Sequence, residues 1–73
     1  MQKAFTVTAD WDSEACVFTS QSDIPGLVVE AATFEELVEL VEALAPEVIS
    51  ANVPGARRPY TVEIVIHRQL AVS

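Results

Sequence analysis

The sequence has one cysteine, one histidine and two glycines in 73 residues. A single cysteine, Cys16, excludes an intrachain disulfide and with it the disulfide framework of small secreted domains. Two glycines, each directly after a proline, leave no glycine-rich loop that could cradle a phosphate. The first residues contain no apolar run of signal-peptide length, and no stretch is long enough to cross a membrane. The sequence therefore predicts a cytoplasmic protein that does not associate with a membrane.

Basic residues are also few. Four Lys and Arg residues stand against 11 Asp and Glu residues, which gives a formal net charge of −7. A surface of this sign repels the phosphate backbone of nucleic acids, so we expect no direct binding to DNA or RNA. The excess of acid has two interpretations, which the sequence leaves open: a surface that promotes solubility, or a surface that attracts a basic protein.

Apolar residues are plentiful and make up 51% of the chain. This share is enough for a packed core and argues against disorder. The length predicts a single domain over residues 1–73, with no separate DNA-binding segment. Because so short a chain has difficulty hiding this much apolar surface, we expect a second copy to cover part of it and predict a homodimer.

Alternating side chains predict two strands near the N-terminus. Residues 4–9 alternate apolar side chains with threonine, and residues 15–20 resume a strand after a polar loop, so the two form a hairpin. Pro25 and Gly26 then form a second turn, in which Gly26 supplies a positive φ. A short third strand is predicted over residues 27–29.

A helix is predicted to begin after Thr33, which forms a capping box with Glu36. In this arrangement the Thr33 hydroxyl accepts a hydrogen bond from the Glu36 N–H, and the Glu36 side chain reaches back to the Thr33 N–H. Pro46 projects to the polar half, where we expect a kink or break before a short continuation to about Ser50. At 100° per residue the apolar half contains Leu37, Leu40, Val41, Leu44, Ala45 and Val48, with Phe34, Val38 and Ile49 at its margin.

The last strand is predicted from alternating apolar side chains, namely Tyr60, Val62, Ile64 and Ile66, with a weak continuation through Leu70 and Val72. The element order is then β-β-β-α-β. The fold class is α+β: a two-layer sandwich of a mostly antiparallel four-stranded sheet with one helix on one face. The open face or the free edge of the long last strand is expected to carry the dimer contact. This face is only half polar and includes Thr6, Thr8, Ala15 and Val17.

Candidate catalytic residues do not form a recognisable site. A remnant two-metal nuclease site would draw on five carboxylates: Asp10, Asp12, Glu14, Asp23 and Glu30. Such a site needs carboxylates that converge from strand centres and a helix, whereas the first three fall in the predicted hairpin turn, where Asp is favoured for backbone reasons. His67 is interpreted as an ordinary strand-face residue and Cys16 as a small core residue. We therefore predict no enzyme activity, no catalytic residue, no metal and no cofactor.

Four residues are candidates for contact with a partner. Trp11 is either an interface anchor beside carboxylates or a cover over the edge of the core, and both interpretations stay open. The other three form a stripe on the helix with no lysine at helical spacing to neutralise it: Glu35, Glu39 and Glu42. This stripe is either a solvated face or a surface for a basic protein. Structural roles are assigned to Pro25, Gly26, Thr33 and Glu36.

Four groups of residues resemble one bacterial family. They are Phe5-x-Val7-x-Ala9-x-Trp11-Asp12-x-Glu14-Ala15-x-Val17, Ser22-Asp23-Ile24-Pro25-Gly26-Leu27-x-x-Glu30-Ala31, Thr33-x-Glu35-Glu36-Leu37 and Ala45-Pro46-Glu47. On these residues, the chain resembles a short, uncharacterised bacterial family within the HicB-like antitoxin superfamily, from residue 4 to about residue 66. The resemblance implies a partial ribonuclease-H-like fold with sheet order 3-2-1-4 and the helix across one face.

The resemblance also implies a function. In HicB proteins this domain binds and blocks HicA, a small basic toxin with a double-stranded-RNA-binding-type fold that degrades messenger RNA. HicB proteins usually add a C-terminal DNA-binding segment, which we do not expect here. The first hypothesis is therefore a non-catalytic, HicB-like protein-binding module, an antitoxin-type partner of a small basic RNA-cleaving toxin. The alternative is a stand-alone dimeric ligand-binding or structural protein, and a residual nuclease is the third hypothesis.

Overall fold

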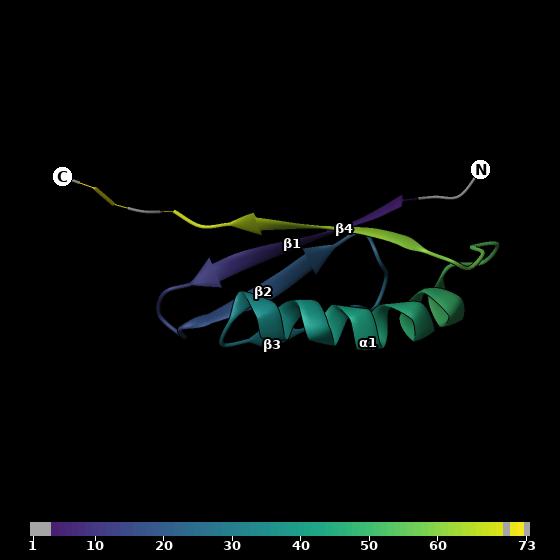
Figure 1. The fold of residues 1–73 in the computed structure, drawn as a ribbon, viewed down its shortest axis with the longest axis horizontal. Coiled ribbons are helices and arrows are strands. Elements are labelled where there is room, and N and C mark those ends of the chain that lie inside the picture. The colour runs from purple at the N-terminus through teal and green to yellow at the C-terminus, as the bar shows by residue number, and fades with distance from the viewer. Residues whose placement is uncertain (1–3, 70, 73) are drawn as a thin grey trace.

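The computed structural model describes residues 4–69, 71 and 72. Its elements follow the chain in the order β1 (Ala4–Asp12), β2 (Val17–Ser22), β3 (Glu30–Ala31), α1 (Phe34–Asn52) and β4 (Thr61–His67). The strands form one four-stranded sheet in the order β3-β2-β1-β4, and α1 lies along one side of it (Figure 1). The predicted α+β class, element order and sheet order are confirmed. Both pairs made by β2 are antiparallel, whereas β1 and β4 are parallel, so the sheet is mixed.

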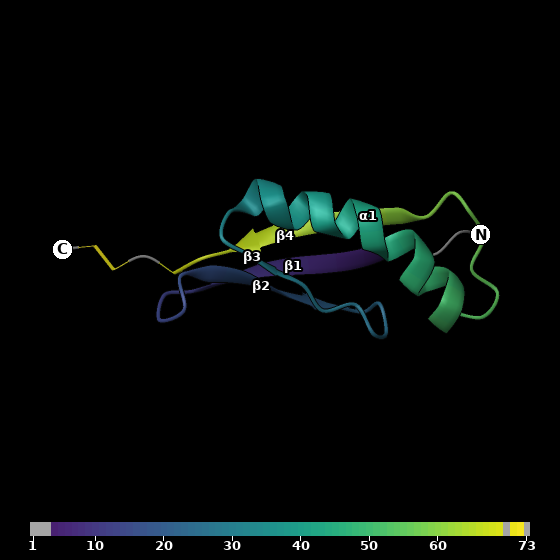
Figure 2. The same ribbon diagram turned by 90° about the horizontal axis from the view of Figure 1, so that it is seen from below.

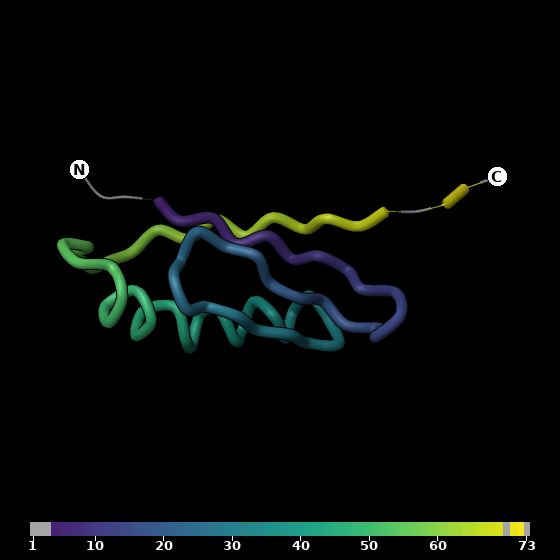
Figure 3. The backbone as a smooth tube through the Cα atoms, turned by 180° about the vertical axis from the view of Figure 1, so that it is seen from behind, coloured from purple at the N-terminus to yellow at the C-terminus, as the bar shows by residue number. Residues whose placement is uncertain are grey.

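The two faces of β1 divide as the alternation predicts. Phe5, Val7 and Ala9 are buried, whereas Thr6 between them is exposed. Across the parallel pair, each of the three buried residues lies beside an apolar residue of β4, and the two strands run side by side (Figure 3). These three residues form the core together with buried residues of β2, β3, α1 and the segment between β2 and β3: Phe18, Ile24, Leu27, Val29, Ala31, Leu37, Val41, Ala45 and Ile49.

The start of α1 is confirmed. The Thr33 backbone is extended (φ −128°, ψ 158°), and its Oγ1 accepts a hydrogen bond from the Glu36 N–H at 3.1 Å. The helix continues through Pro46 to Asn52 rather than stopping near Ser50. Its last turns tilt away from the axis of the first (Figure 2), as expected for a proline that removes one backbone hydrogen bond.

The predicted apolar half of α1 is too wide. Leu40 and Leu44 are 37% and 40% exposed. The fully buried residues instead form a narrow row with a spacing of four residues, namely Leu37, Val41, Ala45 and Ile49. A single helix on a sheet buries only the side chains that point at the sheet, and a hydrophobicity projection cannot show how narrow that contact is.

The N-terminal hairpin turns later than predicted. Asp10 and Trp11 lie within β1, and the turn covers residues 13–16. Cys16 is exposed at the end of this turn with a φ of 57°, and its Sγ lies 3.6 Å from the Ser13 carbonyl oxygen. The prediction of a core cysteine is wrong, because the turn needs a left-handed residue just before β2. Ala15 also lies in the turn and so is not part of the open face of the sheet.

The predicted strand over residues 27–29 is wrong, although Leu27 and Val29 are buried there. The buried Ser20 side chain explains the difference: its Oγ accepts a hydrogen bond from the Val29 N–H at 2.9 Å, while the Ser20 N–H donates to the Val29 carbonyl. The Val29 N–H is thus bonded to a side-chain hydroxyl instead of a backbone carbonyl of β2. Regular backbone pairing with β2 begins only at β3. Val28, between the two buried residues, is 80% exposed.

The turn that contains Pro25 and Gly26 is tied to the end of α1. Asn52 Nδ2 donates to the Pro25 carbonyl at 3.2 Å. Gly26 has a φ of +85°, as predicted, and a Cβ at this position would lie 3.1 Å from Asn52 Nδ2. The positive φ favours glycine here, and a Cβ would also make a tight contact with the Asn52 amide.

The last strand is shorter than predicted. It ends at His67, and Val72 lies outside any strand, while Leu70 falls outside the described residues. As predicted for a strand with a free edge, β4 pairs with β1 on one side, and no described strand pairs with its other side. None of the helices among the described residues has the length and apolar character needed to span a membrane.

Candidate functional site

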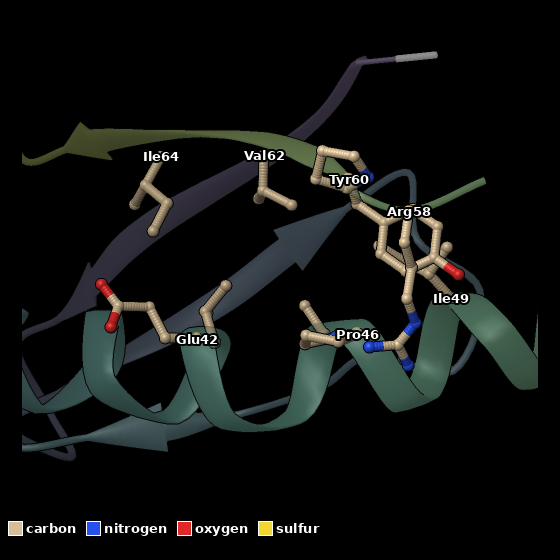
Figure 4. A pocket seen from close by; sticks show the side chains of 10 residues that line it. Glu42, Pro46, Ile49, Arg58, Tyr60, Val62 and Ile64 are labelled. Carbon is tan, nitrogen blue, oxygen red and sulfur yellow. The ribbon is translucent and has the colours of Figure 1, made fainter. Parts of the chain in front are cut away.

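A groove of about 730 Å³ runs between α1 and β4 (Figure 4). It exists because α1 lies closest to β2 and β3, at the opposite edge of the sheet from β4. The apolar face of β4 is therefore only half covered: Val62 and Ile64 are partly buried and point toward the helix. The groove forms because a single helix is too narrow to cover one face of a four-stranded sheet.

The groove is apolar along its length and polar at its ends. Val41, Ala45 and Ile49 form its helix wall. Arg58 and Tyr60 lie at one end, with the guanidinium carbon 5.5 Å from the centre of the tyrosine ring. Pro46 is half-buried and lines the groove one turn after Glu42, on the same side of α1 as the acidic residues. Glu42 lies at the end near Ile64 (Figure 4).

The acidic stripe of the sequence lies on the groove side of α1. Glu35, Glu39 and Glu42 are all exposed, and Glu42 lines the groove directly. At 100° per residue, Glu35 and Glu39 lie within about 60° of Glu42 around the helix. We call these three residues the acidic rim. Their spacing predicts the stripe, but only the structure shows that Glu42, its last residue, borders an apolar surface.

Trp11 lies over one end of the core. It is half-buried in β1 and makes an edge contact with Phe18 at 4.9 Å between ring centres, and Phe18 in turn contacts Phe34 at 6.2 Å. The guanidinium carbon of Arg68 lies 5.2 Å from the centre of the indole. This is the second of the two interpretations of Trp11, in which the indole covers the edge of the core. Trp11 does not line the groove, so the four candidate partner residues do not form a single patch there.

His67 pairs with Asp10 on the open face of the sheet. The two residues are register partners in the β1–β4 pair, and His67 Nδ1 lies 2.9 Å from Asp10 Oδ1. The histidine side chain is 64% exposed and the aspartate 27%. His67 is thus a strand-face residue, as expected, but it has a carboxylate partner that the sequence does not reveal, because the two residues are far apart in the chain.

Two of the five candidate nuclease carboxylates accept hydrogen bonds from the backbone. Asp12 Oδ1 accepts from the N–H groups of Glu14 and Ala15 at 3.0 and 3.3 Å, which stabilises the hairpin turn. Asp23 Oδ1 accepts from the Thr6 N–H at 3.0 Å and so continues the pairing of β1 beyond β2. Within residues 4–69, 71 and 72, no three His, Cys, Asp or Glu side chains gather closely enough to hold a metal ion.

A domain of unknown function, DUF1902, matches residues 4–72 of the sequence. The chain belongs to this family. It is also similar to a hypothetical protein from the extremely thermophilic bacterium Thermus thermophilus, whose crystal structure has a TM-score of 0.82 and 35% sequence identity to it. That similarity covers 96% of this chain and 100% of the other. No curated protein matches this chain. The expectation of a small, uncharacterised family is therefore confirmed.

Sequence reasoning identified only Glu42 among the residues that line the groove, and it missed, among others, four residues in and before β4: Arg58, Pro59, Tyr60 and Val62. From the sequence, the first two lead into the last strand and the other two belong to its apolar face. The alternation in β4 is a usable signal for that face. Whether the helix covers it depends on how α1 lies across the sheet, which no local pattern in this DUF1902 chain specifies.

Proposed function

We propose that the chain is a non-catalytic, HicB-like protein-binding module that captures a small basic protein, as an antitoxin-type partner of an RNA-cleaving toxin. The observation that carries this proposal is the acidic rim beside the apolar groove. The resemblance of the sequence to HicB-like antitoxins and the net charge of −7 support it. A cytoplasmic location stays a prediction of the sequence.

The groove and the rim supply two different parts of binding. Apolar side chains of the partner would cover the half-buried Val62 and Ile64, and removing apolar surface from water is the main source of affinity in a protein interface. The three rim carboxylates would steer a basic partner toward the groove and exclude acidic ones. The partner segment that fits is one with apolar residues on one side and Lys or Arg beside them.

A stand-alone, ligand-binding or structural dimer is the second candidate function. Arg58 and Tyr60 favour it, because they place a guanidinium and a phenol at one end of an otherwise apolar groove. Few polar groups in an apolar site are typical of small-molecule binding. This function does not need the acidic rim, whereas capture of a basic protein does.

Co-purification tests the proposed function. We expect the tagged full chain, recovered from its native host at low ionic strength, to retain one small basic protein. We expect the retained protein to dissociate as salt is raised, because the distance over which exposed charges attract each other falls from about 10 Å at 0.1 M salt to about 3 Å at 1 M. Its gene is expected beside that of this chain. Recovery of the chain without any protein at low salt would contradict the proposal and favour the second candidate.

A further inference from the structure

We propose that the outer edge of β4 pairs antiparallel with β4 of a second copy, about a twofold axis that passes beside Val65. The two sheets then form one continuous sheet, and both helices lie on the same face of it. This inference concerns the assembly of the chain with itself and does not depend on the capture of a basic protein.

The edge of β4 carries the apolar surface that a second copy would cover. Val65 and Ile66 are 40% and 51% exposed, although they are neighbours in a strand and point to opposite faces. Both faces of this strand are thus open to solvent beside an edge that no described strand occupies. Sheets normally protect such an edge with lysine, proline or a bulge, and β4 has none of these between Thr61 and His67.

The charges of β4 select one register for the pairing. Glu63 is the only acidic residue of the strand, and His67, four residues later, is its only residue that can become cationic. In an antiparallel pair with Val65 opposite its own copy, Glu63 of each copy lies opposite His67 of the other on the open face. His67 uses Nδ1 for Asp10, which leaves Nε2 for this carboxylate.

The same register matches the apolar residues. Val65 meets its own copy on the open face, and Ile64 meets Ile66 of the second copy on the helix face. Moving the axis by two residues toward the N-terminus would instead place Glu63 opposite Glu63, and like charges directly opposite each other destabilise a sheet. The register about Val65 is therefore self-complementary in both charge and apolar contact.

The overall charge distribution also favours this edge. The chain has four Lys and Arg residues, and three of them flank β4 in the sequence: Arg57, Arg58 and Arg68. Elsewhere two copies of a chain with a net charge of −7 would bring acidic surfaces together, which opposes association. The β4 edge is where a second copy meets the least repulsion.

Cysteine cross-linking tests the register in the full chain, after Cys16→Ser removes the native thiol. We expect Val65→Cys to form a disulfide-linked dimer under mild oxidation, because opposite Cα atoms in an antiparallel pair lie about 4.5–5.5 Å apart, within the range that a disulfide spans. Glu63→Cys is the matched control. In the proposed register it lies four residues from its own copy along the strand, roughly 13 Å away, and should remain monomeric after denaturation.

Sedimentation of the unmodified chain gives an independent readout. We expect a dimer for the wild type and for Val28→Lys, which places a lysine on an exposed valine away from β4. We expect a monomer for Val65→Lys, which brings two ammonium groups together at the axis. Cross-linking of Glu63→Cys but not Val65→Cys, or a wild type that sediments as a monomer, would overturn the proposal.

Discussion

Replacing Leu37 with alanine should lower the free energy of unfolding by about 2–5 kcal/mol, the range measured for large-to-small changes in packed cores. Leu37 is 0% exposed and begins the buried row of α1. The removed methyl groups leave a cavity between the helix and the sheet that so small a core has few side chains to fill. Small domains have total stabilities near the low end of about 5–15 kcal/mol. A large fraction of the Leu37→Ala molecules should therefore be unfolded at moderate urea concentration.

Leu40→Ala is the matched control, since it makes the same chemical change in the same helix. Leu40 is 37% exposed and lies outside the buried row. We expect a loss of about 1 kcal/mol or less, because surface substitutions seldom cost more. Urea titration followed by circular dichroism measures both. Equal losses for the two variants would show that the helix buries a wider face than the structure has.

Reversing the charge of the acidic rim should strongly weaken capture of the proposed basic partner. The triple variant Glu35→Lys, Glu39→Lys, Glu42→Lys removes three attractive groups and replaces them with repulsive ones. Exposed charge pairs contribute about 0.2–1 kcal/mol each, so three reversals should weaken binding roughly 100-fold at physiological salt. The dissociation constant of the co-purified protein, measured by titration calorimetry, gives this ratio.

The control for the rim is a second triple variant with the same change in net charge: Glu14→Lys, Glu30→Lys, Glu47→Lys. All three positions are exposed, and none lines the groove. We expect this variant to bind the partner with an affinity within about threefold of that of the wild type. At physiological salt, the attraction between a bound partner and charges far from the groove is largely screened. If both triples lose binding equally, net charge rather than the rim governs the interaction.

Most of the fold could be predicted from sequence, because its signals are local. Alternation in β1, the Thr33 cap and the turn at Gly26 each depend on neighbouring residues, and each is found where the sequence predicts it. The exceptions are also informative. The segment at residues 27–29 has strand-like composition, but a serine hydroxyl from β2 takes the place of its backbone partner at Val29.

The site could be predicted only in part. The acidic rim follows from helical spacing, and the apolar face of β4 follows from alternation. That these two features border one groove depends on α1 lying over β2 and β3, and on β4 returning parallel to β1. The pairing of His67 with Asp10 is likewise a product of this register. Contacts between residues far apart in the chain have no signature in a single sequence.

We propose that a basic protein binds in the groove between α1 and β4, beside the acidic rim. Amide hydrogen–nitrogen correlation spectra of the isotope-labelled full chain, titrated with the co-purified protein, test it most directly. We expect the largest shift changes at Val41, Glu42, Ile49, Tyr60 and Val62, and little change at the hairpin turn over residues 13–16. Shifts concentrated on the open face of the sheet or on that turn, with the groove unchanged, would contradict the account.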